Sequence, residues 1–138
     1  MPLFRIINAD VLAGLRTLPD ASVHCCVTSP PYWGLRDYGV AGQLGLETTP
    51  EAYVSVMVDV FREVRRVLRD DGTLWLNIGD SYSARGQNSG SRPEDLTDKQ
   101  RSNGGCRYER RTTPEGMKPK DLAGIPWALS FSLRSDGW

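Results

Sequence analysis

The sequence has few cysteines, no long hydrophobic run and no excess of charge of either sign. It contains three cysteines, Cys25 and Cys26 side by side and Cys106 far from them. An odd count without metal-ligand spacing argues against a disulfide framework and against a zinc site. No apolar run approaches membrane-spanning length, and the amino-terminal residues lack a signal-peptide pattern. We therefore expect a cytoplasmic protein with no membrane contact and no bound metal.

The formal net charge is zero, because 17 basic residues balance 17 acidic ones. Contact with a nucleic acid would therefore depend on local basic clusters and not on a positive field around the whole protein. The 138 residues suffice for one domain with one core, and the composition is ordinary for a globular protein. The only histidine, His24, lies in an apolar run and is interpreted as a strand residue and not as a catalytic base.

Strand-like and helix-like patterns alternate along the chain. Short β-prone runs cover residues 4–7, 23–27 and 73–78. Leucines at helical spacing predict a helix over residues 12–18, and a longer apolar stripe predicts a second helix from about Thr49 to Leu68. Thr48 and Glu51 have the spacing of a capping box, and Pro50 suits a first helical turn. This order predicts an α/β fold, a parallel sheet with crossover helices.

The remainder of the chain divides into a polar segment and a last helix. From about Ala84 to Lys118 the residues are mainly Gly, Ser, Asn, Arg and acids, so this stretch is predicted to be a long polar loop. An amphipathic helix is predicted beyond it, ending at Asp136-Gly137, with its apolar side formed by Leu122, Ile125, Leu129 and Leu133.

The most informative stretch is the run Thr28-Ser29-Pro30-Pro31-Tyr32-Trp33, directly after the strand predicted at 23–27. Two consecutive prolines cannot continue a strand, because neither has an N–H to donate. They fix a rigid turn with a hydroxyl, carbonyl oxygens and two aromatic faces at the carboxyl end of the strand. Ligands bind at that end in open α/β sheets, and this arrangement suits a planar ring that carries an amino group.

Four segments in this order resemble the amino-methylating DNA methyltransferases, most closely the cytosine-N4 enzymes of bacterial restriction-modification systems and phages. The segments are Asp10, residues 28–33, residues 74–80, and residues 118–138. The resemblance covers nearly the whole chain apart from the polar loop. It implies a partial Rossmann-like fold that uses S-adenosylmethionine, with residues 1–138 as the amino-terminal part that holds the target base.

The resemblance implies a role for each residue of the turn. A base amine is a poor nucleophile, and acceptors aimed at its two N–H groups offset the positive charge that develops on it. In the family, the side chain at the Ser29 position and the carbonyl at the Pro30 position supply these acceptors. The ring at the Tyr32 position stacks on the flipped-out base. Ser29, Pro30, Pro31 and Tyr32 are thus the expected catalytic residues, and Trp33 either shapes the target-base pocket or covers the edge of the core.

Methyl transfer in this family is direct, so no covalent enzyme intermediate is needed. Cys25 and Cys26 are accordingly interpreted as small buried residues. The resemblance implies contact of Asp10 and Ser29 with S-adenosylmethionine. Asp10 could equally cap the helix that follows it, and Asp80 could line the pocket or form a turn after Gly79.

The expected partner is double-stranded DNA with a flipped cytosine. Serine at position 29, where most adenine-N6 enzymes have aspartate, favours cytosine N4 as the target. Methylation of adenine N6 and a non-catalytic DNA-binding remnant stay open as alternatives. In the polar loop, the residues expected to contact the DNA backbone are Arg107, Arg110, Arg111 and Lys118.

The sequence contains no match to the Phe-x-Gly-x-Gly turn that accommodates the methionine part of the cofactor in this family. We therefore expect a missing carboxy-terminal half as a further partner. We also expect little binding of S-adenosylmethionine by these 138 residues alone.

Overall fold

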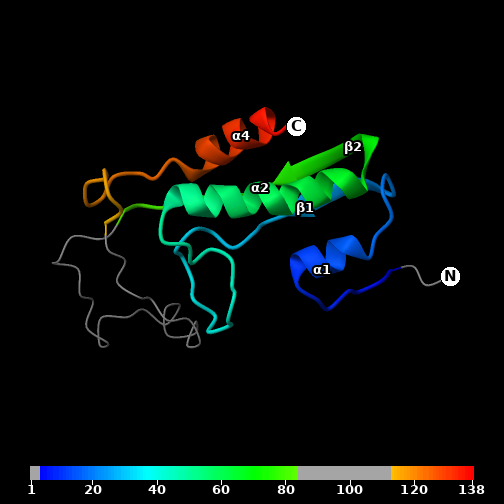
Figure 1. Ribbon diagram of the computed structural model, residues 1–138, viewed down its shortest axis with the longest axis horizontal. Coiled ribbons are helices and arrows are strands. Elements are labelled where there is room, and N and C mark those ends of the chain that lie inside the picture. The colour runs from blue at the N-terminus through cyan, green and yellow to red at the C-terminus, as the bar shows by residue number, and fades with distance from the viewer. Residues whose placement is uncertain (1–3, 84–112) are drawn as a thin grey trace.

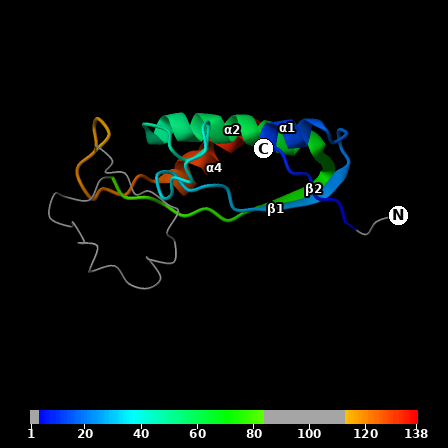
Figure 2. The same cartoon turned by 90° about the horizontal axis from the view of Figure 1, so that it is seen from below.

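A parallel pair of strands with helices on one face forms the framework of this computed structural model, which describes residues 4–83 and 113–138. The elements in chain order are α1 (Val11–Arg16), β1 (Val23–Thr28), α2 (Pro50–Val67), β2 (Leu68–Leu76) and α4 (Ile125–Ser135) (Figure 1). Seen from below, α1, α2 and α4 all lie on the same side of the two strands (Figure 2). Helix α2 is the crossover between β1 and β2, as the strand-helix-strand pattern predicts.

Helix α2 forms the centre of the molecule. Its N-cap is Thr49, whose Oγ1 accepts a hydrogen bond from the Ala52 N–H at 3.1 Å, so the capping residue expected at Thr48 is one position too early. Pro50 occupies the first turn, where its missing N–H costs no hydrogen bond. The expected apolar stripe is confirmed, because nine residues of this helix are buried.

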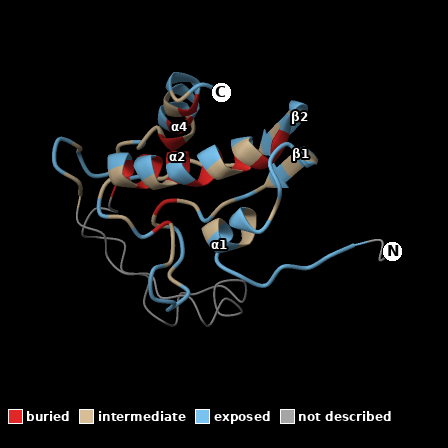
Figure 3. Cartoon of the chain, turned by 45° about the vertical axis from the view of Figure 1, so that its right-hand side comes forward, coloured by how far each residue is buried: buried red, intermediate tan, exposed pale blue. Residues whose placement is uncertain are grey.

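The core lies between α2, α4 and the turn that follows β1. Figure 3 shows buried residues along α2 and α4, while α1 contributes only intermediate ones. The largest enclosed apolar side chains, each 2% exposed or less, are Trp33, Tyr53, Met57, Phe61, Ile125 and Leu129. From the sheet, Cys26, Leu74 and Leu76 pack against this cluster. The core therefore supports the turn after β1 directly.

The sheet is smaller than the sequence predicts. Residues 4–7, expected to be a strand, have no regular structure, and Phe4 and Ile6 are 77% and 82% exposed. A strand needs a neighbour for its backbone and a surface for its side chains, and this segment has neither in the described part of the protein. The parallel α/β arrangement is thus confirmed, whereas a fuller Rossmann-like sheet stays a prediction.

The second strand begins earlier than predicted. Strand β2 starts at Leu68, and its register with β1 shifts between Val23 and Cys25 before it becomes regular. From there Val27 pairs with Trp75, and Thr28 with Leu76. Cys26 is half-buried, and burial together with its neighbour Cys25 raises the pKa of its thiol. Cys25, expected to be buried, is exposed, because successive residues of a strand lie on opposite faces and Cys26 is on the half-buried one.

Helix α4 confirms the predicted last helix over a shorter range. Ile125, Leu129 and Leu133 are buried on it, and the helix ends at Ser135 with Asp136 as its C-cap. Leu122, expected on the same stripe, precedes the helix and forms an isolated antiparallel bridge with Tyr82. Within residues 4–83 and 113–138, no helix is both long and apolar enough to cross a membrane.

Candidate active site at the end of strand β1

The turn at residues 29–33 lies where β1 and β2 both reach their carboxyl ends. The Asn77 N–H donates to the Thr28 carbonyl oxygen at 2.9 Å, which holds the two chain segments side by side as they leave the sheet. Gly79 then lies against the ring of Tyr32, so closely that a Cβ added there would be 2.8 Å from Tyr32 Cε2. Residues 77–80 therefore form a second wall beside the turn, at the sheet edge where α/β proteins bind ligands.

A buried tyrosine anchors the turn from inside. The hydroxyl of Tyr53, on α2, donates to the Pro31 carbonyl oxygen at 2.9 Å. Burial raises the pKa of Tyr53 above its ordinary range, and negative charge at Glu47 and Tyr32 adds to the shift. The hydroxyl therefore stays protonated and remains a donor at any physiological pH. The Pro31 carbonyl oxygen is thus occupied by a hydrogen bond that holds the turn to α2.

The loop after the turn folds back beneath it. The Gly34 N–H donates to the Gly45 carbonyl at 2.6 Å, which closes the loop between these two residues. Gly45 has a φ of +94°, and a Cβ on it would lie 3.1 Å from the Tyr32 carbonyl oxygen. A side chain at position 45 would therefore be strained in its backbone and crowded against the turn.

Ser29 and the Pro30 carbonyl remain available on the outer side. Ser29 is exposed, and its hydroxyl donates to the Tyr32 hydroxyl oxygen at 3.5 Å, a long and weak contact. Among the hydrogen bonds within residues 4–83 and 113–138, none uses the Pro30 carbonyl. Ser29 and Pro30 thus carry two oxygen atoms on adjacent residues, and the nearby Tyr32 is half-buried.

Trp33 is a core residue in this structure. Its side chain is 1% exposed, and its indole N–H donates to the Glu47 carbonyl oxygen at 2.8 Å. The Ser81 hydroxyl donates to the Trp33 carbonyl at 2.6 Å, which ties the turn to the segment after β2. Trp33 supports the turn from beneath, and contact of its ring with a target base stays a prediction.

Asp10 is the N-cap of α1, which is one of the two roles expected for it. Its Oδ1 accepts hydrogen bonds from the N–H groups of Leu12 at 3.0 Å and Ala13 at 3.2 Å. The residue is exposed, so the cap leaves the carboxylate at the surface. Contact of Asp10 with the cofactor stays a prediction.

Asp80 has a structural role that the sequence analysis missed. Its carboxylate accepts from the N–H groups of Ser81 at 2.8 Å, Gly124 at 3.0 Å and Ile125 at 3.0 Å. Helix α4 has glycine at its N-cap and therefore no capping side chain of its own. A carboxylate 44 residues earlier in the chain supplies the cap and fixes α4 to the wall beside the turn. The signal in the sequence was Gly124 itself, because a glycine at the start of a helix has no side chain with which to cap it.

Of the four basic residues expected to contact DNA, Lys118 alone lies within the described residues. It is exposed, its N–H donates to Asp121 Oδ2 at 2.9 Å, and its carbonyl accepts from the Ser83 hydroxyl. The other three, Arg107, Arg110 and Arg111, lie outside the described residues. Contact with the DNA backbone stays a prediction for all four.

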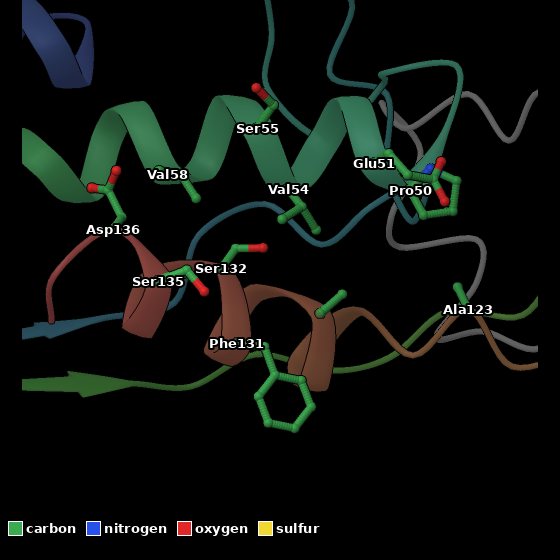
Figure 4. A pocket seen from close by; sticks show the side chains of 11 residues that line it. Pro50, Glu51, Val54, Ser55, Val58, Ala123, Phe131, Ser132, Ser135 and Asp136 are labelled. Carbon is green, nitrogen blue, oxygen red and sulfur yellow. The ribbon is translucent and has the colours of Figure 1, made fainter.

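A separate open groove of about 590 Å³ runs between α2 and α4 (Figure 4). Val54, Val58 and Phe131 line it, and no residue of the 29–33 turn does. Asp136, at the carboxyl end of α4, also lines the groove, and its carboxylate forms a salt bridge with Arg62 at 2.6 Å. Arg62 accordingly lowers the pKa of Asp136. Among the residues described, no group of three His, Cys, Asp or Glu side chains is arranged to hold a metal.

Comparison with known proteins identifies the family of this chain. The family model described as DNA methylase matches residues 23–122, which include the turn, α2 and the wall at 77–80. Type II methyltransferase M.Cfr9I of Citrobacter freundii is 51% identical over 133 residues, 96% of this chain and 42% of the relative. Type II methyltransferase M.XycI of Xanthomonas campestris pv. cyanopsidis is 53% identical over 96% of this chain and 42% of the relative. Type II methyltransferase M.SmaI of Serratia marcescens is 51% identical over 97% of this chain and 44% of the relative.

This chain therefore spans less than half the length of these relatives. DNA methyltransferases of this family use S-adenosylmethionine as the methyl donor. The matched residues contain the whole turn and the elements that hold it, and the chain belongs to the amino-methylating DNA methylase family.

Proposed function

We propose that this chain holds the target base of a DNA methyltransferase that methylates the exocyclic N4 amine of cytosine. The observation that carries the proposal is the different use of the two proline carbonyls. Tyr53 binds the Pro31 carbonyl, whereas no hydrogen bond in the described part of the chain uses that of Pro30. Together with the exposed Ser29 hydroxyl, the Pro30 carbonyl gives two acceptors for the two N–H groups of one amine.

The chemistry follows from this geometry. Two accepted hydrogen bonds draw electron density toward the amine nitrogen and stabilise the positive charge that develops on it during methyl transfer. The rigid turn holds both acceptors in place before the base arrives, so little reorganisation is needed. The Tyr32 ring, supported on one side by Gly79, stacks on the flipped base in this proposal.

S-adenosylmethionine supplies the methyl group when it is bound. Two residues of this chain fit contact with it, since the Asp10 carboxylate and the Ser29 hydroxyl are both exposed oxygen groups that suit a ligand with hydroxyl and cationic groups. Asp10 would bind through the part of its carboxylate that the α1 cap does not use. In this proposal, the rest of the cofactor site lies in the part of the relatives that this chain does not match.

A chimera tests the function. In it, this chain replaces the matched part of the Citrobacter freundii relative, and mass spectrometry identifies the methylated nucleoside in treated double-stranded DNA. We expect N4-methylcytosine. N6-methyladenine would replace the cytosine proposal, and DNA binding without any methylated product from a folded chimera would leave only a binding function.

Substitution of Tyr32 tests the role of the ring within the same chimera. Loss of a base-stacking contact of about 1–3 kcal/mol predicts that Tyr32→Ala lowers activity by roughly 5- to 150-fold. The matched control is Tyr38→Ala, because Tyr38 is 51% exposed in the loop after the turn. Equal activity of the two variants would refute stacking by Tyr32.

A further inference from the structure

The loop that folds back beneath the turn carries an acidic residue, Glu47, where the loop meets the core. Both oxygens of its carboxylate accept from the Gly45 N–H, at 3.2 and 3.0 Å. Its backbone carbonyl accepts from the indole N–H of Trp33 at 2.8 Å. Glu47 is half-buried, whereas Gly45 and Trp33 are buried. The side chain and the backbone of Glu47 thus bind two residues that support the turn.

Gly45 brings this carboxylate close to the turn. A Cβ added to Gly45 would lie 3.2 Å from Pro31 Cβ and 3.4 Å from the Pro31 carbonyl oxygen. Because the Glu47 carboxylate is bonded to the N–H of the same glycine, a single residue separates it from Pro31. The Gly45 N–H is a neutral donor, so this contact fixes the carboxylate without cancelling its negative charge.

The same charge acts on the buried hydroxyl that anchors the turn. The Tyr53 hydroxyl donates to the Pro31 carbonyl oxygen. Burial raises the pKa of Tyr53, and the charges of Glu47 and Tyr32 raise it further. Tyr53 and Trp33 are each 1% exposed or less, so little water lies beneath the turn to screen a charge. The electrostatic effect of Glu47 therefore reaches the residues that carry the turn.

We propose that Glu47 is a positioning residue of the methylation site, whose negative charge stabilises the positive charge that develops on the target amine. The amine binds at Ser29 and Pro30 in the proposed function, on which this inference rests. Glu47 does not touch the base, because Gly45 and Pro31 lie between them. The same effect applies to cytosine and to adenine, since both carry an exocyclic amine.

The alternative role for Glu47 is closure of the loop by its hydrogen bond with Gly45 alone. The two roles require different properties of the side chain. Glu47→Gln keeps an oxygen acceptor and nearly the same volume but has no charge. Glu47→Asp keeps the charge and shortens the side chain by one methylene group. Loop closure depends on the acceptor, whereas electrostatic stabilisation depends on the charge.

Steady-state kinetics of the chimera separate these roles. At an effective dielectric constant of about 20, a full charge and a half charge about 10 Å apart change a rate by roughly fourfold. We therefore expect Glu47→Gln to lower kcat by about 3- to 10-fold. The KM values for DNA and S-adenosylmethionine should change less than about twofold, because the charge on the amine develops only in the transition state. Glu47→Asp should keep a higher kcat than Glu47→Gln.

The matched control is Glu51→Gln, because Glu51 is an exposed acid in the first turn of α2 and lines the separate groove (Figure 4). This variant should keep the kcat of the unsubstituted chimera. Urea denaturation of each variant confirms that the compared proteins are folded.

Nuclear magnetic resonance of the chimera labelled with ¹⁵N-glycine tests the contact itself, without DNA or S-adenosylmethionine. The Gly45 amide resonance of the unsubstituted chimera should move as acid protonates the carboxylate groups, because a charge-assisted hydrogen bond is stronger than a neutral one. In Glu47→Gln this movement should be lost, and in Glu51→Gln it should remain. The first of these spectra requires no substitution.

The proposal is overturned if the Gly45 resonance does not respond to acid, or if Glu47→Gln keeps the kcat of the unsubstituted chimera. It is also overturned if Glu47→Gln and Glu47→Asp lower kcat equally, because the charge would then be irrelevant. A folded unsubstituted chimera that yields no methylated DNA would contradict the proposed function and this inference with it. An active chimera in which Glu47→Gln has no effect would contradict the role of Glu47 alone.

Discussion

The hydrogen bond from Tyr53 to Pro31 allows a quantitative test of how the turn is held. Tyr53→Phe removes the hydroxyl and leaves the apolar packing of the ring unchanged. A hydrogen bond contributes about 0.5–1.5 kcal/mol net, and an acceptor left without any partner costs about 1–3 kcal/mol. Pro31 is exposed, so water can replace the lost donor in part. We therefore expect the free energy of unfolding to fall by about 1 kcal/mol, within the range for a lost hydrogen bond and at the low end of the range for an unpartnered acceptor.

The pH dependence of this loss distinguishes a buried donor from an incidental contact. Burial raises the pKa of Tyr53, so the folded protein keeps the hydroxyl protonated while the unfolded chain ionises it above its ordinary value of 10.0. The folded state then binds more protons, and stability falls as pH rises above about 10, by up to about 1.4 kcal/mol per pH unit. Tyr53→Phe lacks this group, so the difference between the two proteins should shrink above pH 10 and stay constant below it.

Urea denaturation followed by far-UV circular dichroism, at several pH values from about 7 to about 10.5, measures both effects. Tyr38→Phe serves as the control, because Tyr38 is 51% exposed in the loop after the turn. The reasoning fails if Tyr53→Phe unfolds at the same urea concentration as the unsubstituted protein near neutral pH. It also fails if the difference between the two proteins stays constant from pH 9 to about 10.5.

Two further substitutions test the wall beside the turn. Gly79→Ala places a methyl group 2.8 Å from Tyr32 Cε2, so the ring must shift. A displacement of about 1 Å at a reacting group can cost on the order of 100-fold in rate, and we expect the chimera to lose at least tenfold in methylation. Gly14→Ala, whose new Cβ would meet only ordinary contacts at 3.6 Å, should retain activity. Asp80→Ala should cost about 1–2 kcal/mol in urea denaturation and speed hydrogen exchange at Ile125 and the first turn of α4; unchanged exchange there would contradict the proposed cap.

The elements that local patterns determine were predictable from the sequence. Helix α2 has a continuous apolar stripe and a proline in its first turn, and both signals depend only on near neighbours along the chain. The parallel pairing of β1 with β2 also followed, since a helix of this length between two apolar runs favours a crossover. The cap was misplaced by one residue, because Thr48 and Thr49 are chemically equivalent candidates and only the backbone geometry distinguishes them.

Features that depend on distant parts of the chain could not be predicted. The segment 4–7 has the composition of a strand, but strand formation requires a neighbour that the described structure does not provide. Asp80 was interpreted as a turn or pocket residue, because nothing near it in the sequence indicates that its partners are Gly124 and Ile125. Trp33 is the last residue of the turn, yet its burial depends on α2, and its indole N–H is bonded to the Glu47 carbonyl oxygen.

The position of the core explains why the turn after β1 and the exposed face of the sheet differ in how they are supported. Trp33 and Tyr53 belong to the buried cluster, so the turn is fixed by the same contacts that fold the chain. Val27 and Trp75 lie outside that cluster and are 79% and 65% exposed in the described part of the chain. Under the proposed function, the acceptors at Ser29 and Pro30 are therefore held by the fold of this chain before a base binds.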